Sequence, residues 1–213
     1  MAASGGLRAL RNKKKESVPR TISTRSTYLL REVADKGETL ELPDESTAPT
    51  HLVWCKVEYP NAASYGDSAE KYKYFVVHCQ VRDGLYKGGH FRIAVDLRGT
   101  ENYPFQPPKA KMLTQIWHPN FDLEGGICHS HLKLPGPPAN GSWMPGLRCC
   151  GLIEGLLLCF DVTSEAFFPR DPLNHEAADQ FLNNRAAFEA KAKDWVSKYA
   201  KPVAIPKDDL ARK

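Results

Sequence analysis

The sequence predicts an α+β fold, in which helices and an antiparallel sheet occupy separate parts of one chain. Three observations predict it. A segment with helical spacing of apolar residues comes first. Four short runs rich in Val, Ile, Tyr and Phe follow between residues 52 and 113, separated by turn residues. Beyond a long stretch rich in Gly and Pro, three more helical segments complete the chain.

Residues 1–25 are expected to form a flexible, basic extension. Most of this segment is small, polar or positively charged, so burial could not offset the conformational entropy lost on ordering it. Leu7 and Leu10 lie three residues apart among arginines, a pattern that fits either one helical turn in a partner's groove or a chance occurrence. We place the folded core at residues 26–200 and a C-terminal tail at 201–213.

The core is expected to begin with an amphipathic helix over residues 26–41, which prolines end. The predicted strands then cover residues 52–59, 72–81, 91–97 and 109–113. Because the links between successive strands are short, they should pair as an antiparallel meander.

The three later helices have distinct patterns. Residues 147–160 are apolar on nearly every side, which is typical of a helix buried at the centre of a domain. Asp171 and Pro172 are suited to the N-cap and first turn of a helix that ends near residue 184. Residues 188–199 are expected to form the last, amphipathic helix.

Composition excludes several classes of protein. The net charge is only +4, and the excess of Lys and Arg gathers near the N-terminus instead of on a folded face, which argues against binding to nucleic acid. No apolar run approaches the ~20 residues of a membrane span, and the first ten residues lack a signal-peptide pattern. We therefore expect a monomer of the cytoplasm and nucleus that contacts neither membrane nor nucleic acid.

The six cysteines are expected to be free thiols in a reducing compartment. Three of them lie in apolar runs, where a thiol packs as a small hydrophobe: Cys55, Cys79 and Cys159.

Cys128 differs, because it follows Gly125 and Gly126 in a loop. A thiol that carries an acyl group must be exposed to two large partners, and glycine neighbours would leave room for an extended peptide. Cys128 is therefore the predicted nucleophile.

Four motifs surround Cys128 in the sequence: Tyr103-Pro104-Phe105-Gln106-Pro107-Pro108, Trp117-His118-Pro119-Asn120, Gly125-Gly126-Ile127-Cys128 and Trp143-Met144-Pro145. Singly they are weak signals, since a His-Pro-Asn triplet also marks an ordinary turn. Together they resemble the ubiquitin-conjugating (UBC) enzyme family, whose cysteine lies eight residues after the Asn of that triplet, as Cys128 lies after Asn120. The resemblance implies the UBC fold over residues 26–200 and a transferase that carries its modifier as a thioester.

The resemblance also implies roles for residues around the cysteine. Asn120 would stabilise charge on the thioester carbonyl oxygen or hold the loop that positions it. Asp171 would orient the incoming lysine and lower its effective pKa, although an Asp before Pro is equally suited to a helix N-cap. His118, together with Pro119, would brace the loop from inside and would not take protons.

One branch of the family fits best. Residues 171–178 and 183–185 resemble the neddylation conjugating enzymes, and the segment between Cys128 and Trp143 is similar to the lengthened post-cysteine loop of the one paired with the second RING-box protein. This implies a NEDD-type modifier, a cullin lysine as acceptor, and a heterodimeric activating enzyme that consumes ATP and docks on Leu7 and Leu10. No cofactor is expected in the chain itself. A RING-type ligase would dock on an exposed patch formed by three residues: Phe105, Pro145 and Gly146.

Four other interpretations compete with this one. Two keep the UBC fold: an enzyme that conjugates ubiquitin itself, and a non-catalytic scaffold. A Cys-His protease would need a distant histidine with an orienting Asn, and only His118 and His175 come into question. A zinc cluster is disfavoured because two of its ligands would be adjacent at the start of an apolar helix, whereas zinc ligands usually lie about two to four residues apart. Its members would be Cys128, His129, His131, Cys149 and Cys150.

Overall fold

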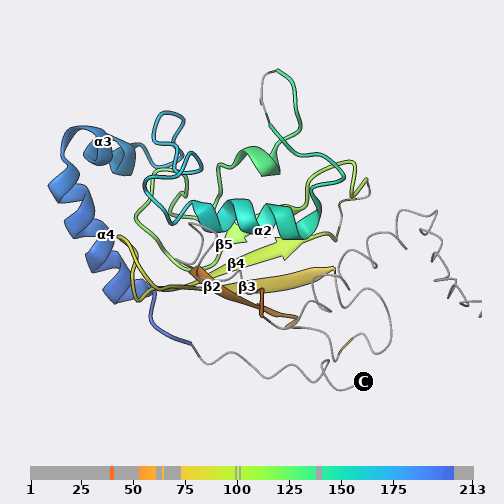
Figure 1. Ribbon diagram of the computed structural model, residues 1–213, viewed down its shortest axis with the longest axis horizontal. Helices are drawn as coiled ribbons and strands as arrows, with labels where there is room; N and C mark the ends of the chain where they lie inside the picture. Colours follow the sequence, from red (N-terminus) through yellow and green to blue (C-terminus); the bar gives the residue numbers. More distant parts are fainter. Residues whose placement is uncertain are drawn as a thin grey trace, which may run out of the picture.

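A five-stranded antiparallel sheet with helices on one face and at one end forms the folded core (Figure 1). The computed structural model describes residues 39–40, 53–60, 64, 73–98, 100, 102–137 and 141–203. The strands lie side by side in sequence order: β1 (Thr39–Leu40), β2 (Val53–Glu58), β3 (Tyr74–Val81), β4 (His90–Asp96) and β5 (Lys109–Met112). The predicted α+β class and four-stranded meander are confirmed by β2 to β5.

Strand β3 lies at the centre of this sheet. Phe75, Val77 and Cys79 point to one face and are almost completely buried there. Val76 and His78, which alternate with them, are also buried, so β3 is covered on both faces. The turn to β4 uses two glycines in the left-handed region, Gly84 with φ 79° and Gly88 with φ 82°. The register is fixed by β-branched and aromatic side chains that pair across the strands.

Strand β1 corrects the end of the predicted first helix. Thr39 pairs with Lys56 and Leu40 pairs with Cys55, so these residues add an edge strand to β2. The backbone groups at an open sheet edge bind an extended segment of chain, and this tertiary pairing outweighs the helical spacing of nearby leucines. Residues 26–38 of the predicted helix lie outside the described residues.

Helix α2 (Arg148–Leu158) lies along one face of the sheet, as expected for the apolar segment 147–160 (Figure 1). Its contribution to the core consists of five residues that are at most 2% exposed: Cys149, Leu152, Ile153, Leu156 and Leu157. These side chains join those of β3 and β4 in one hydrophobic cluster. The prediction of a buried central helix is therefore confirmed.

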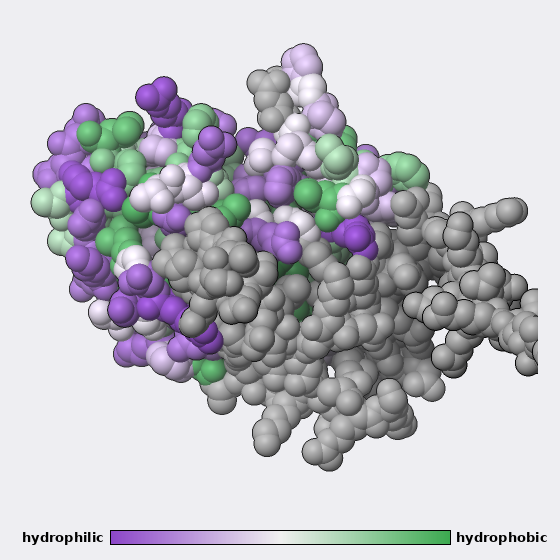
Figure 2. All heavy atoms as spheres, in the orientation of Figure 1, coloured by the Kyte–Doolittle hydropathy of each residue, from purple (hydrophilic) through white to green (hydrophobic). Residues whose placement is uncertain are grey.

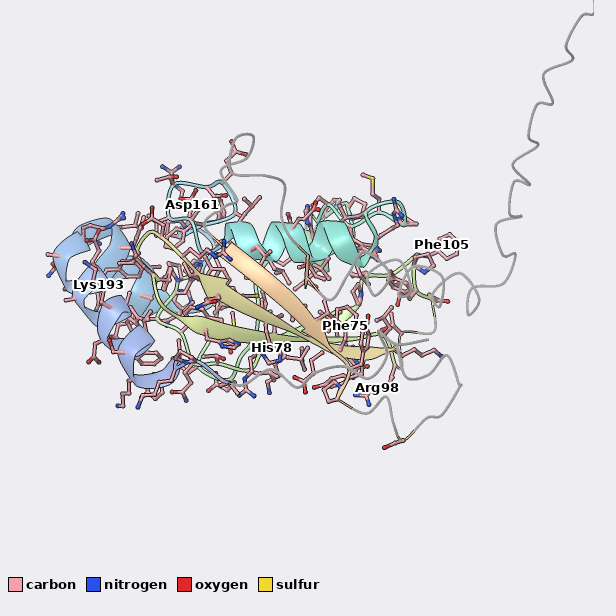
Figure 3. The ribbon with its side chains drawn as sticks, turned by 60° about the horizontal axis from the view of Figure 1, so that its bottom comes forward. Phe75, His78, Arg98, Phe105, Asp161 and Lys193 are labelled. Atoms are coloured by element: carbon pink, nitrogen blue, oxygen red, sulfur yellow. The ribbon has the colours of Figure 1, made fainter. Side chains whose placement is uncertain are left out.

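Helices α3 (His175–Asn183) and α4 (Arg185–Tyr199) lie at one end of the sheet, and Phe105 lies at the opposite end (Figure 3). The predicted N-cap of α3 is wrong. The Asn174 side chain accepts a hydrogen bond from the backbone N–H of Ala177 and caps the helix, whereas Asp171 precedes it in a loop. Asn184 caps α4 in the same way through the N–H of Ala187. The visible surface over α3 and α4 is mostly hydrophilic (Figure 2).

Parts of the predicted domain organisation lie outside the described residues and stay predictions. Leu7, Leu10 and the rest of the extension 1–25 lie outside them, as do residues 204–213 of the C-terminal tail. No helix within the described ranges is long and apolar enough to cross a membrane.

Candidate active site

The His-Pro-Asn triplet forms the buried floor of the site. His118 is fully buried against the rings of Tyr86, Phe121 and Phe167. Its Nδ1 accepts the backbone N–H of Asn120 at 2.9 Å, and its Nε2 donates to the carbonyl of Cys159 at 2.8 Å. Both ring nitrogens are therefore occupied, and burial lowers the pKa of His118 to about 3. This geometry favours the bracing role and leaves the imidazole neutral.

The Asn120 side chain is 1% exposed and is bound entirely to one residue across the site. Its Nδ2 donates to the carbonyl of Phe168 at 2.7 Å, and its Oδ1 accepts the Phe168 N–H at 2.8 Å. Of the two roles considered for this amide, holding the loop has direct support, because both polar ends are already used.

Pro119 holds the same loop from its other end. Its carbonyl accepts two backbone hydrogen bonds, from Leu173 at 2.9 Å and from Asn174 at 3.0 Å. Asp171 lies between these anchor points and Phe168, and its side chain is 68% exposed. The triplet therefore fixes the backbone on both sides of an exposed carboxylate.

Cys128 lies at the end of a tight turn that packs on β5. Its N–H donates to the carbonyl of Asn120 at 2.8 Å, and an isolated bridge pairs Phe121 with Ile127. The turn itself explains why glycines precede Cys128. Gly125 has φ 91°, and a Cβ there would collide with the carbonyl of Met112. A Cβ at Gly126 would collide with the Asp122 carboxylate, so the turn itself requires both glycines, whether or not they also leave room for a peptide.

The Cys128 sulfur is half-buried and lies between two charged side chains. Lys133 Nζ donates to Sγ at 3.1 Å, and Asp171 Oδ2 lies 3.8 Å from Sγ. The same Nζ and Oδ2 are 3.7 Å apart, so the three groups form a triangle. The hydrogen bond to Cys128 and the charge of Asp171 raise the pKa of Lys133. The site thus brings together a reachable thiol, an amine and a carboxylate.

Lys133 was missed by the sequence reasoning. It is brought back toward Cys128 by the short 3-10 helix η4 (Ser130–Leu132). A signal was present, because Lys133 is the only Lys or Arg between Cys128 and Arg148. Its distance from the sulfur depends on the turn, which the sequence pattern did not predict.

The two histidines after Cys128, His129 and His131, pack against helix α2. The His129 Nδ1 accepts the N–H of His131 at 3.1 Å, and their rings are 4.7 Å apart. Both lie against Gly155 of α2, where a Cβ would collide with the rings. Burial lowers the pKa of His129 to about 4 and also lowers that of His131. Among the described residues, no three His, Cys, Asp or Glu side chains gather as metal ligands would.

The predicted ligase-docking residues lie on two loops that contact each other. Trp143 is buried, and its Nε1 donates to the carbonyl of Pro104 at 2.9 Å. Phe105, which follows Pro104, is 56% exposed. The bond therefore holds its loop against the loop of the three residues that follow Trp143. Of these, Met144 is 60% exposed, Pro145 is half-buried and Gly146 is exposed. Phe105 lies at the end of the sheet away from α4 (Figure 3), and the exposed side chains of Phe105 and Met144 give these two loops apolar surface.

Sequence comparison identifies the class of protein. The signature described as "Ubiquitin-conjugating enzyme" matches residues 54–196, and the chain therefore belongs to the ubiquitin-conjugating enzyme family. Members of this family are transferases of ubiquitin-like proteins, and the predicted enzyme class is confirmed.

Curated relatives fall into two groups. The NEDD8-conjugating enzyme UBE2F of Gallus gallus is 32% identical over 188 residues, which is 85% of each chain. The ubiquitin-conjugating enzyme E2 T of Xenopus laevis is 38% identical over 118 residues, which is 55% of this chain and 57% of the relative. This chain thus spans little more than half the length of E2 T. The predicted resemblance to neddylation conjugating enzymes is confirmed by the first group.

A solved structure supports the fold. A crystal structure assigned to the ubiquitin-conjugating enzymes, from Plasmodium yoelii, superposes with a TM-score of 0.58 at 19% identity and covers 87% of this chain and 99% of that one. The predicted UBC fold is therefore confirmed.

Proposed function

We propose that this chain accepts a NEDD8-type modifier from its activating enzyme as a thioester on Cys128 and transfers it to a lysine of a cullin. The half-exposed Cys128 sulfur carries this proposal. Among the four thiols whose burial the structure describes, Cys79, Cys149 and Cys159 are buried and Cys128 is not. Burial raises the pKa of the Cys159 thiol to about 12, so that thiol is no competitor as nucleophile.

The choice of modifier rests on the relatives. The alignment with UBE2F covers 188 residues and extends beyond the family signature, whereas the alignment with E2 T covers 118 residues. A UbcE2M protein of Drosophila melanogaster, also a NEDD8-conjugating enzyme, is 38% identical over 111 residues. Similarity that continues outside the shared core supports the NEDD8 branch.

The transfer step uses the exposed carboxylate. An incoming lysine amine that reaches the thioester carbon passes Asp171, whose Oδ2 lies 3.8 Å from the sulfur. The carboxylate orients the amine and accepts one of its hydrogen bonds while the neutral nitrogen attacks. Asn120 and Pro119 contribute by fixing the backbone on either side of Asp171. ATP is consumed upstream by the activating enzyme, and this chain uses no cofactor.

Partner docking is assigned to two separate surfaces. A RING-box ligase binds the patch formed by Phe105, Pro145 and Gly146, where exposed apolar area favours a protein partner. The heterodimeric activating enzyme binds the extension that holds Leu7 and Leu10. The chain acts as a monomer in the cytoplasm and nucleus.

A second candidate function is the conjugation of ubiquitin. The 38% identity to E2 T over 118 residues favours it, because this identity is higher than the 32% found with UBE2F over 188 residues. The two functions share Cys128 and differ in the activating enzyme and the modifier that the chain accepts.

Loading separates the candidates. The full chain is incubated with ATP and either the NEDD8 activating enzyme and NEDD8 or the ubiquitin activating enzyme and ubiquitin, and then run on gels with and without reductant. A reductant-sensitive adduct with NEDD8 alone supports the proposal. An adduct with ubiquitin alone supports the second candidate, and none with either identifies a non-catalytic scaffold.

A further inference from the structure

We propose that Lys133 is a built-in acceptor: the modifier carried on Cys128 moves to Lys133 Nζ when no external amine arrives. The inference rests on the proposed function, since it needs a thioester on Cys128. It starts from the shortest contact of the Cys128 sulfur, the 3.1 Å hydrogen bond from Lys133 Nζ. An amine at that distance from a loaded sulfur lies next to the carbon that amines attack.

The geometry is held by the fold. Reacting atoms in near-attack conformers lie about 3–3.5 Å apart, and the thioester carbon is bonded directly to the sulfur that Nζ already contacts. The Lys133 backbone is fixed on both sides. Its N–H donates to the carbonyl of Ser130 at 3.1 Å, and its carbonyl accepts the N–H of Trp143 at 3.1 Å. The Lys133 side chain is only 34% exposed, so few other positions compete for the amine.

The step balances without a further reactant. The Lys133 ammonium first loses a proton to solvent, and the neutral Nζ attacks the thioester carbonyl carbon. A C–N bond forms and the C–S bond breaks. Cys128 leaves as a thiolate. The new amide nitrogen then releases a proton, which converts this thiolate back to the thiol. The products are an isopeptide on Lys133 and a free Cys128.

Protonation keeps this transfer slow. A lysine amine is almost entirely protonated near pH 7, and the Asp171 carboxylate, 3.7 Å from Lys133 Nζ, favours the charged form. Effective molarities of about 10⁵–10⁸ M for well-oriented intramolecular reactions offset the small fraction of neutral amine. The rate of self-transfer should rise with pH, because deprotonation supplies the nucleophile.

Transfer to Lys133 would also limit the enzyme. The modifier on this lysine would remain beside the Cys128 sulfur, which is half-buried even in the free chain. A self-modified chain should therefore accept a second modifier poorly. The Lys133–Asp171 pair, 3.7 Å apart, also shows how the same carboxylate can hold an external lysine.

The test compares the full-length chain with two variants. Lys133→Arg keeps the positive charge but removes the nucleophilic amine. Lys87→Arg is the matched control, because Lys87 is exposed on the β3–β4 turn, where it pairs with Asp83. Each protein is loaded with NEDD8, its activating enzyme and ATP, loading is stopped with EDTA, and samples are followed without an acceptor at pH 7 and pH 9.

A reductant-resistant band should grow in the wild type and in Lys87→Arg, faster at pH 9, and should fall at least about tenfold in Lys133→Arg. Peptide mass mapping should place the modifier on Lys133. The inference is overturned if a reducible adduct forms but no resistant band follows, or if Lys133→Arg gives an equal resistant band. If neither NEDD8 nor ubiquitin forms a reducible adduct, the proposed function fails, and the transfer to Lys133 fails with it.

Discussion

The Asn120 side chain and the Phe168 backbone form a closed pair of hydrogen bonds, 2.7 Å from Nδ2 to the carbonyl and 2.8 Å from the N–H to Oδ1. This pair joins the turn before Cys128 to the loop that carries Asp171. The relative position of the thiol and the carboxylate therefore depends on an amide that is bound to Phe168 through both its nitrogen and its oxygen.

Asn120→Ala should weaken this connection and leave the two Phe168 groups without partners. Each of the two hydrogen bonds contributes about 0.5–1.5 kcal/mol, so the free energy of unfolding in urea should drop by about 1–3 kcal/mol in total. Loading of Cys128 should persist, while discharge to lysine should slow because Asp171 is less well held. Asn183→Ala, which removes an exposed side-chain bond on α3, is the control and should change neither quantity. Normal discharge in Asn120→Ala would remove this residue from the mechanism.

Cys128→Ser should trap the modifier as an ester that resists reductant and is cleaved by hydroxylamine, since oxygen replaces the attacking sulfur. Cys128→Ala should give no adduct at all. Gel electrophoresis of the loading reaction measures both. A reducible adduct in Cys128→Ala would show that another thiol carries the modifier and would contradict the assignment.

Stability should fall in mild acid because His118 and His129 are buried as neutral rings. Burial lowers the pKa of His129 from 6.5 to about 4, so between these values the unfolded chain binds more protons than the folded chain. The free energy of unfolding should therefore decrease as pH falls from 6.5 to 4, by up to about 1.4 kcal/mol per pH unit for each such histidine.

His129→Asn tests this dependence. An Asn oxygen can replace Nδ1 as the acceptor for the His131 N–H, so the cap of η4 is kept while the titrating group is lost. Urea unfolding at several pH values should give a smaller slope between pH 6.5 and 4 than the wild type. An unchanged slope would mean that His129 does not contribute to acid sensitivity.

Phe105→Ala should reduce ligase-stimulated discharge and leave loading and stability unchanged. The side chain is 56% exposed, and truncation of an exposed residue usually changes stability by less than about 0.5 kcal/mol. Loss of an aromatic anchor from a docking surface commonly weakens binding at least about fivefold. Leu182→Ala on α3, with 57% exposure at the other end of the molecule, is the control. An equal effect of both substitutions would argue against docking at Phe105.

Removal of residues 1–20 should slow loading by the activating enzyme without unfolding the core. A Leu7→Ala, Leu10→Ala double variant should reproduce the effect if the two leucines are the contact, whereas Val18→Ala in the same segment should load normally. Single-turnover loading rates and thermal unfolding measure the two effects. Unchanged rates would make the extension incidental.

Most of the fold could be predicted because local patterns and tertiary packing agree in it. The predicted strands match β2 to β5 within two residues at each end, and the buried character of α2 was evident from its apolar composition. The predictions were wrong where a tertiary contact, and not the local sequence pattern, determined the backbone conformation. Leu40 fits a helical pattern but pairs with Cys55 in the sheet. Asn174 is the N-cap in place of Asp171, because the Pro119 carbonyl binds the N–H groups of Leu173 and Asn174 and holds this backbone outside the helix.

The candidate site was predictable in part. Residues within a continuous motif, such as His118 and Asn120, could be placed together from the sequence alone. The hydrogen bonds of Asn120 to Phe168 join positions 48 residues apart, and no local pattern encodes such a pair. Lys133 was missed because its approach to Cys128 depends on the conformation of η4, a short irregular turn.

Trp143 connects the loop of Pro104 and Phe105 with the segment that carries Lys133. Its indole nitrogen donates to the carbonyl of Pro104, next to Phe105, and its backbone N–H donates to the carbonyl of Lys133, whose amine contacts Cys128. The indole is 1% exposed and has little room to turn. One buried residue therefore joins the loop that carries Phe105 to the backbone of Lys133, so a displacement of either loop has to be accommodated by Trp143.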